Sequence, residues 1–169
     1  MEINMISGLN CVGGNPNEWL DHPSNAEHVV FDDEVINVIN IKEAPVEVQE
    51  WLSDEYGGGA AFYGHCPESG RQVHLVFCDT SNPFVLYHEI GHVVLGHTKL
   101  LLEMALSGKS LTKGETLRQE FEADEYASRI VGVGKAMIAL SEIFDNNPNR
   151  TMQQMMQINH RVVYLSTLL

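Results

Sequence analysis

The chain has 169 residues, of which 44% are hydrophobic and 20% charged, so its composition is that of one globular domain long enough to bury a core. Its formal net charge of −13 at pH 7 argues against nucleic-acid binding, because neutralising phosphates requires a basic face. The sequence shows no apolar run of about 18 residues, no signal-peptide pattern and no paired spacing of Cys11, Cys66 and Cys78, which predicts a cytoplasmic protein with reduced thiols and no membrane span.

We expect a single domain over residues 1–169, in which a sheet region precedes a helical region. An irregular N-terminal segment is expected over residues 1–34, since Gly, Asn, Pro and Asp are frequent there, with a short helix near residues 25–30. A sheet region is expected over residues 35–80. Its predicted strands contain many β-branched and aromatic side chains and cover residues 35–41, 60–65 and 71–78.

Residues 81–169 are expected to form a helical region. Its first helix has Asn82 as the N-cap and Pro83 at the first helical position, and apolar side chains then recur with helical spacing up to Val94. A mobile connection over residues 107–114 is a candidate substrate-contact loop. Further helices are predicted at about residues 99–106, 115–131, 135–144 and 151–168.

The most informative stretch is His88-Glu89-Ile90-Gly91-His92, an HExxH motif inside the first predicted helix. Positions i and i+4 of a helix lie about 40° apart, so His88 and His92 point the same way and can bind one zinc ion. Glu89 lies one residue further round, where its carboxylate can take a proton from a metal-bound water. The motif is therefore typical of a metallohydrolase. SprT-like proteases of DNA–protein crosslinks share it, but the acidic net charge disfavours them.

A zinc site of this kind needs a third protein ligand, and the sequence offers three candidates. His97 does not fit the extended HExxHxxGxxH pattern, and on a continuous helix it would point to the side opposite His88. Glu120 and Glu122 lie together in a later predicted helix. Glu120 and Asp124 share one face of that helix, so one carboxylate could bind zinc while the other accepts a hydrogen bond from a ligand histidine.

The sequence HEIGHVVLGH, followed later in the chain by EFEAD, resembles the gluzincin zinc metallopeptidases of the HtpX and CAAX-prenyl endopeptidase type and the related soluble ImmA/IrrE peptidases. The resemblance covers roughly residues 72–145. It implies that zinc is the cofactor, that His88, His92 and Glu120 are the metal ligands, and that Glu89 is the general base.

The same resemblance implies that Asp124 orients a ligand histidine. Near the C-terminus, His160 is similar in setting to a segment of the HtpX-type enzymes in which a basic or hydroxyl side chain stabilises the oxyanion, although the proline of that segment is absent here. His160 is therefore predicted to be this catalytic donor, and Tyr126 and Tyr164 are comparable candidates.

These observations predict an α+β fold of the minimal gluzincin type, in which a small mixed β-sheet packs on the HExxH helix and the Glu120 helix, with a mostly helical C-terminal half. The predicted function is that of a soluble zinc-dependent endopeptidase acting on a protein or peptide substrate. Two alternatives stay open: a zinc-binding regulatory protein with this fold and little or no proteolysis, and a purely structural metal. The intact Glu89 favours an enzyme, because a structural zinc has no use for it.

Overall fold

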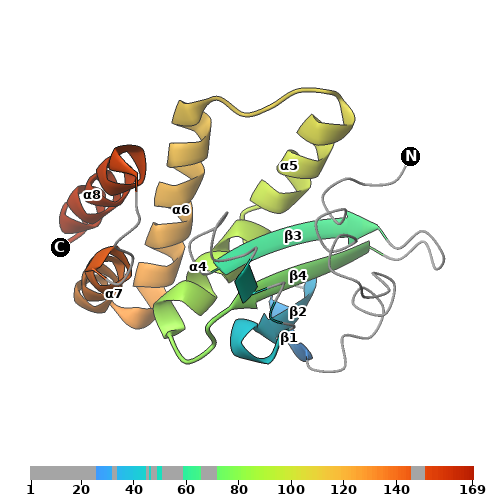
Figure 1. Cartoon of the computed structure of the whole chain (residues 1–169), viewed down its shortest axis with the longest axis horizontal. Helices are drawn as coiled ribbons and strands as arrows, with labels where there is room; N and C mark the ends of the chain where they lie inside the picture. Colours follow the sequence, from blue (N-terminus) through green and yellow to red (C-terminus); the bar gives the residue numbers. More distant parts are fainter. Residues whose placement is uncertain are drawn as a thin grey trace.

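The computed structural model describes residues 26–31, 34–44, 46, 49–50, 59–65, 72–145 and 151–169. Strands precede helices along the chain, and Figure 1 shows the sheet on one side of the molecule and most of the helices on the other. The elements are β1 (Ala26–Phe31), β2 (Glu34–Asn40), the 3-10 turn η1 (Ile41–Glu43), β3 (Gly59–His65), β4 (Gln72–Cys78), α4 (Pro83–Val94), α5 (His97–Leu106), α6 (Lys113–Val131), α7 (Val133–Asp145) and α8 (Met152–Ser166).

The four described strands form one mixed sheet in the order β1-β2-β4-β3. β2 and β4 are parallel, whereas β1 pairs antiparallel with β2 and β3 pairs antiparallel with β4. The central pair is buried on both faces, because Ile36, Ile39, Val76 and Phe77 are all 0% exposed. This burial explains why the two central strands read as nearly continuous apolar runs. The expected α+β fold, with a small mixed sheet and a mostly helical C-terminal half, is confirmed.

Strand β1 shows that the expectation of a short helix near residues 25–30 was wrong. Ala26–Phe31 pairs with β2 along its whole length. A strand obtains its backbone hydrogen bonds from a partner elsewhere in the chain, so the local residue pattern could not reveal this pairing. The preceding part of the segment expected to be irregular, residues 1–25, lies outside the described residues.

Cys78, at the end of β4, is a free and fully buried thiol. Burial raises its pKa to about 12, so at neutral pH it is an uncharged core side chain. This environment agrees with the expected reduced thiol. Cys11 and Cys66 lie outside the described residues.

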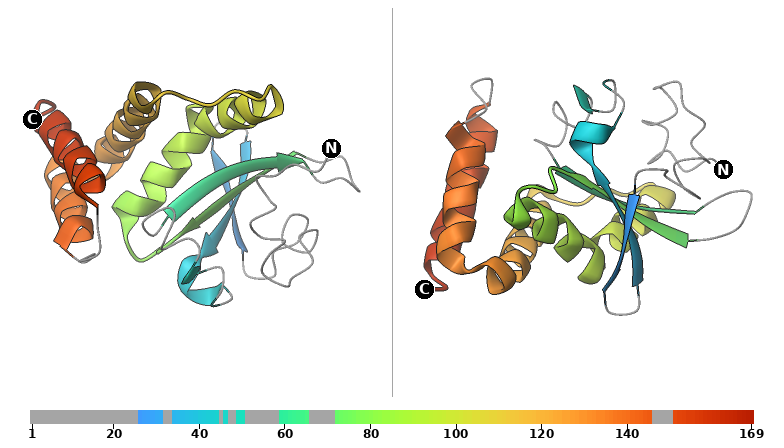
Figure 2. Two further views of the ribbon diagram at one scale, coloured as in Figure 1. Left: turned by 45° about the horizontal axis from the view of Figure 1, so that its top comes forward. Right: turned by 90° about the horizontal axis from the view of Figure 1, so that it is seen from below.

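Helix α4 is held between two hydrophobic clusters. On one side, Ile90 and Val93 pack with Ile36, Val38 and neighbouring side chains of β2 and β4. On the other, its first turn packs with buried side chains of α6, α7 and α8; this second cluster comprises Phe84, Ala127, Ala136, Ala139, Leu140 and Leu165. Figure 2 shows the resulting order, with α4 between the sheet and the group of α6, α7 and α8. Because it is packed on both sides, α4 is a rigid platform for its side chains.

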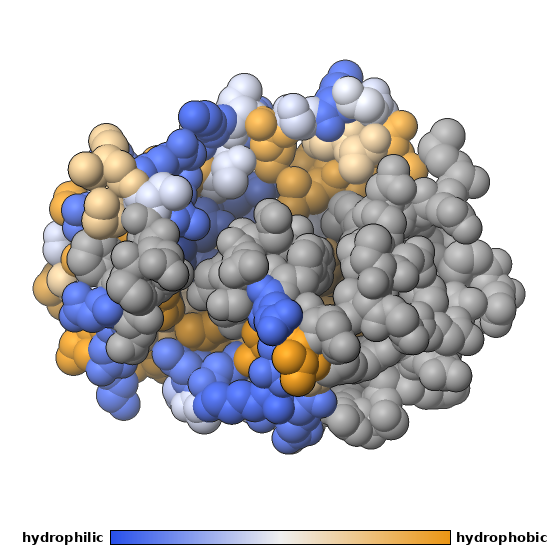
Figure 3. Space-filling model, viewed as in Figure 1, coloured by the Kyte–Doolittle hydropathy of each residue, from blue (hydrophilic) through white to orange (hydrophobic). Residues whose placement is uncertain are grey.

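The surface of the helical region carries apolar side chains among charged ones. In Figure 3, hydrophobic residues are visible over α5, which exposes Leu100, Leu101 and Leu106. Single exposed apolar side chains of this kind are common on protein surfaces. Within the part of the chain that the structure describes, no helix has both the length and the apolar character needed to cross a membrane.

Candidate metal centre

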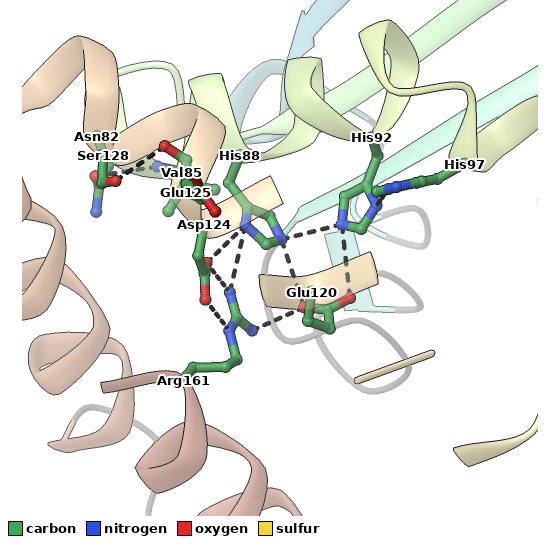
Figure 4. Close-up of polar contacts among 10 residues, drawn as sticks. All are labelled: Asn82, Val85, His88, His92, His97, Glu120, Asp124, Glu125, Ser128 and Arg161. Atoms are coloured by element: carbon green, nitrogen blue, oxygen red, sulfur yellow. Dashed lines mark hydrogen bonds and ion pairs between the residues drawn. The ribbon is translucent and has the colours of Figure 1, made fainter. Parts of the chain in front are cut away.

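Helix α4 begins where its sequence predicts. The Asn82 side chain accepts hydrogen bonds from two backbone N–H groups of the first turn, and Pro83 occupies the position where a missing N–H costs nothing. From this start, His88 and His92 fall one helical turn apart and leave the same side of α4 toward α6, as Figure 4 shows.

Helix α6 approaches α4 closely because small side chains line the contact. A Cβ atom added at Gly91 would lie 3.1 Å from the Tyr126 side chain, so a larger residue there would press on α6. On α6, Ala123 and Ala127 are completely buried. The close approach brings the carboxylate of Glu120 opposite the two histidines.

Three side chains converge on one point between the helices. His88 Nε2 and His92 Nε2 are 3.1 Å apart, and each lies 3.5 Å from one carboxylate oxygen of Glu120. All three ligand atoms lie within 4.8 Å of one another. Two nitrogen atoms bound tetrahedrally at about 2.0–2.1 Å from a zinc ion would be about 3.3 Å apart. The cluster therefore has the donor types and the spacing of a metal site.

A buried ion pair lies behind His88. Asp124 Oδ1 is 2.9 Å from His88 Nδ1, and Arg161 reaches across from α8 to donate two hydrogen bonds of 2.7 Å to the same carboxylate. A third contact places Arg161 Nη1 2.9 Å from Glu120 Oε2. Burial opposes ionisation of both carboxyl groups, but Arg161 outweighs it and holds the pKa of each below its usual range. Both are therefore ionised at neutral pH.

The two histidines of the cluster differ in protonation when no metal is present. Burial lowers the pKa of His88, but its hydrogen bonds to Asp124 and Glu120 outweigh burial and raise that pKa to about 10. Burial, reinforced by repulsion from His88, lowers the pKa of His92 to about 3. One proton on His88 thus supplies the positive charge that this acidic cluster requires, and a bound cation would take over that role.

Glu89 lies on the sheet side of the cluster. Its side chain is buried, and burial raises its pKa to about 7, a value suited to a group that exchanges protons near neutral pH. The backbone of β3 passes directly over it, because a Cβ atom added at Gly59 would lie 2.7 Å from Glu89 Oε1. A larger residue at position 59 would therefore have to displace the Glu89 carboxylate.

His97 does not lie where a continuous helix would place it. Helix α4 ends at Val94, Gly96 adopts a left-handed conformation with φ +77°, and α5 then begins at His97 in a new direction. His97 Nδ1 lies 3.0 Å from His92 Nδ1, and its Nε2 lies 2.9 Å from Glu122 Oε2. The expectation that His97 points away from the site was wrong, since it assumed an unbroken helix. His97 and Glu122 lie behind His92, outside the three-residue cluster.

The candidates for the oxyanion donor lie away from the cluster. His160 is exposed on α8, and Tyr164 donates a hydrogen bond to Glu125. Neither these two residues nor Tyr126 lines the cavity at the cluster. The α8 residue that reaches the site is Arg161, which the sequence reasoning missed. The sequence does contain one indication of this role. Arg161 is the only Asp, Glu, Lys or Arg residue of α8, so any carboxylate that pairs with it belongs to another element.

A cavity of about 570 Å³ contains the cluster. His88, His92, Glu120, Glu89 and Arg161 all line it. Its remaining walls combine the start of β3 with side chains of the helices; among them are residues 59–61, Phe84, Thr98, Leu101, Leu140 and Ile158. The cavity is large enough to hold several residues of an extended peptide beside the cluster.

The family model of Peptidase U49 matches residues 35–142, which is more than half of the chain. The chain belongs to the Peptidase U49 family. The matched range includes all three residues of the cluster, His88, His92 and Glu120, but ends before Arg161. Membership of Peptidase U49 places the chain in a peptidase family, whose substrates are proteins. No curated protein and no solved structure matches the chain.

Proposed function

We propose that this U49 peptidase is a zinc-dependent endopeptidase, with His88, His92 and Glu120 as the metal ligands. The observation that carries the proposal is the convergence of their three ligand atoms within 4.8 Å. Two histidines and one glutamate are a known ligand set of catalytic zinc sites, in which three protein ligands leave one position open. The neighbouring Glu89 distinguishes this arrangement from a structural site, which has no need of a free carboxylate.

Glu89, Asp124 and Arg161 each have a separate role in the proposed reaction. A bound zinc ion lowers the pKa of a coordinated water and polarises the carbonyl group of the peptide bond. Glu89, with its pKa raised to about 7, can accept the proton of the attacking water and pass it to the leaving amine. Asp124 holds the ring of His88 through its Nδ1 atom. Arg161 neutralises Asp124 and Glu120 from behind.

The substrate is proposed to bind along β3. This strand forms one edge of the described sheet, and its residues 59–61 line the cavity next to Glu89. An edge strand offers unpaired backbone N–H and C=O groups, to which an extended peptide can add as a further strand. The Thr98 side chain also lines the cavity, and its buried hydroxyl has no hydrogen-bond partner among the described residues.

The ligand set is tested by the metal content of the purified protein, measured by elemental analysis. We expect about one zinc ion per chain in the wild type and strong loss in Glu120→Ala, because two protein ligands bind zinc weakly. Glu103→Ala, which removes an exposed glutamate on α5, is the matched control and should keep its zinc. Full zinc retention in Glu120→Ala would show that another residue completes the site.

The activity is tested separately with a randomised peptide library, whose cleavage products are identified by mass spectrometry. Cleavage by the zinc-loaded protein that stops after chelation and returns with zinc is the expected result. Stoichiometric zinc without cleavage of any peptide would instead support a zinc-binding regulatory protein.

Replacing Gly59 by Ala tests how the base is held. The added methyl group would lie too close to Glu89 Oε1, so it should displace the carboxylate and lower the rate of peptide cleavage by about 10–100-fold. Zinc content should not change, since the atoms nearest to the added methyl group belong to Glu89 and Val85 and not to the three ligands. Gly114→Ala is the matched control, because a Cβ atom there meets nothing within 4 Å. Wild-type turnover in Gly59→Ala would show that β3 does not position Glu89.

A further inference from the structure

We propose that His97 and Glu122 form a positioning pair that holds His92 in the tautomer with its hydrogen on Nδ1, so that Nε2 is free to bind the metal. The inference rests on the proposed metal site and adds two residues that are not ligands themselves. His97 is almost completely buried, whereas the Glu122 side chain is 44% exposed.

The first step is the contact between Glu122 and His97. Glu122 Oε2 lies 2.9 Å from His97 Nε2, and a carboxylate can only accept a hydrogen bond. His97 Nε2 must therefore carry a hydrogen. A neutral imidazole ring carries a single hydrogen, so when Nε2 of His97 holds it none remains on Nδ1. Its Nδ1 atom then has a free lone pair and acts as an acceptor.

The second step is the contact between His97 and His92. The Nδ1 atoms of His97 and His92 are 3.0 Å apart, a distance at which one must donate to the other. Because His97 Nδ1 accepts, His92 Nδ1 donates. A neutral His92 with its hydrogen on Nδ1 has its lone pair on Nε2. That atom faces the cluster, 3.1 Å from His88 Nε2 and 3.5 Å from Glu120 Oε1. The hydrogen-bond network thus assigns the tautomer that metal binding requires.

Two local features of the fold bring His97 and Glu122 together beside His92. The left-handed conformation of Gly96 ends the first helix and turns His97 back against His92. On α6, Glu120 and Glu122 are two positions apart and therefore point in different directions, one toward the cluster and the other toward His97.

The two ligand histidines are thus held by different groups. His88 contacts a fully buried aspartate that is neutralised by Arg161, and its partner cannot move without breaking an ion pair. His92 depends on a half-exposed carboxylate acting through a second histidine. Figure 4 shows the asymmetry, with Asp124 and Arg161 on one side of the cluster and His97 on the other.

The test compares zinc affinity, measured by competition with a chromophoric chelator. His97→Leu removes the acceptor and keeps a side chain of similar bulk, and Glu122→Ala removes the carboxylate. Both should bind zinc about 10–100-fold more weakly than the wild type. His97→Asn should recover most of the affinity, because its Oδ1 atom takes the place of His97 Nδ1 as the acceptor. Glu103→Ala serves as the control for loss of a surface carboxylate.

A second measurement does not depend on zinc. In the metal-free wild type, nitrogen-15 spectra of the histidine rings should show the His92 hydrogen on Nδ1, and His97→Leu should give a mixture of tautomers. A His92 hydrogen on Nε2 in the wild type, or wild-type zinc affinity in both His97→Leu and Glu122→Ala, would overturn the inference. If His97→Leu does not fold, the zinc affinity of Glu122→Ala tests the inference, since the Glu122 side chain is half exposed and its loss should not prevent folding. Failure of the wild type to bind zinc would refute the proposed function, whereas the spectra would still test the pair.

Discussion

Replacing Glu89 by Gln is expected to lower the rate of peptide hydrolysis by about 10²–10⁴-fold while zinc remains bound. Glutamine has the same size and keeps one oxygen atom in place, but it cannot accept the proton of the attacking water. Zinc binding should be unaffected, since Glu89 is not one of the three clustered ligands. Turnover of a peptide selected from the library and zinc content should be measured on the same preparation. A variant that retains full activity would exclude Glu89 as the base.

We also expect Glu89→Gln to change the stability of the metal-free protein. Burial raises the pKa of Glu89 from its ordinary 4.5 to about 7 in the folded state. Above pH 4.5 the carboxyl group ionises in the unfolded chain but resists ionisation in the folded one, so it destabilises the fold increasingly up to pH 7 and constantly above it. Glu89→Gln removes this cost. It should therefore resist urea better than the wild type at pH 8 and equally at pH 4, and a difference independent of pH would contradict the assignment.

Replacing Arg161 by Met is expected to reduce the free energy of unfolding of the metal-free protein by about 3–5 kcal/mol. Methionine preserves much of the apolar stem but removes the charge. Asp124, which is 0% exposed, would then be left without its counter-charge, and Glu120 would lose one as well. Urea unfolding followed by circular dichroism measures the change. Because Arg161 also connects α8 to α6, its loss should loosen the packing of the last helix.

Arg129→Met is the matched control for this variant. Arg129 pairs with Glu125 one turn away on the same helix, and its side chain is 73% exposed. An exposed pair of this type contributes only about 0.3–0.5 kcal/mol, because water screens it and the long side chains lose freedom. If both arginine variants lost the same stability, the buried network would not be what holds α8 in place.

The sequence by itself determined the features that depend on neighbouring residues. The N-cap at Asn82 and the apolar spacing after it specify where α4 begins, and from this start the positions of His88 and His92 on one face follow. The same reasoning put Glu120 and Asp124 on one face of α6. The strands β2, β3 and β4 were also predictable, because β-branched and aromatic runs bounded by turn residues are local signals.

Only the tertiary structure decided which of these faces meet. Residue spacing could not choose between Glu120 and Glu122, since the choice depends on the direction from which α6 approaches α4. It could not predict the change of direction at Gly96 that returns His97 to the site.

The largest omission was Arg161, which lies 37 residues from Asp124 along the chain and yet donates two hydrogen bonds to it. Helical periodicity and capping act over a few residues, so they specify each element alone. The charges that the buried carboxylates need come from wherever the packing of α8 on α6 can supply them, and no local pattern records that contact.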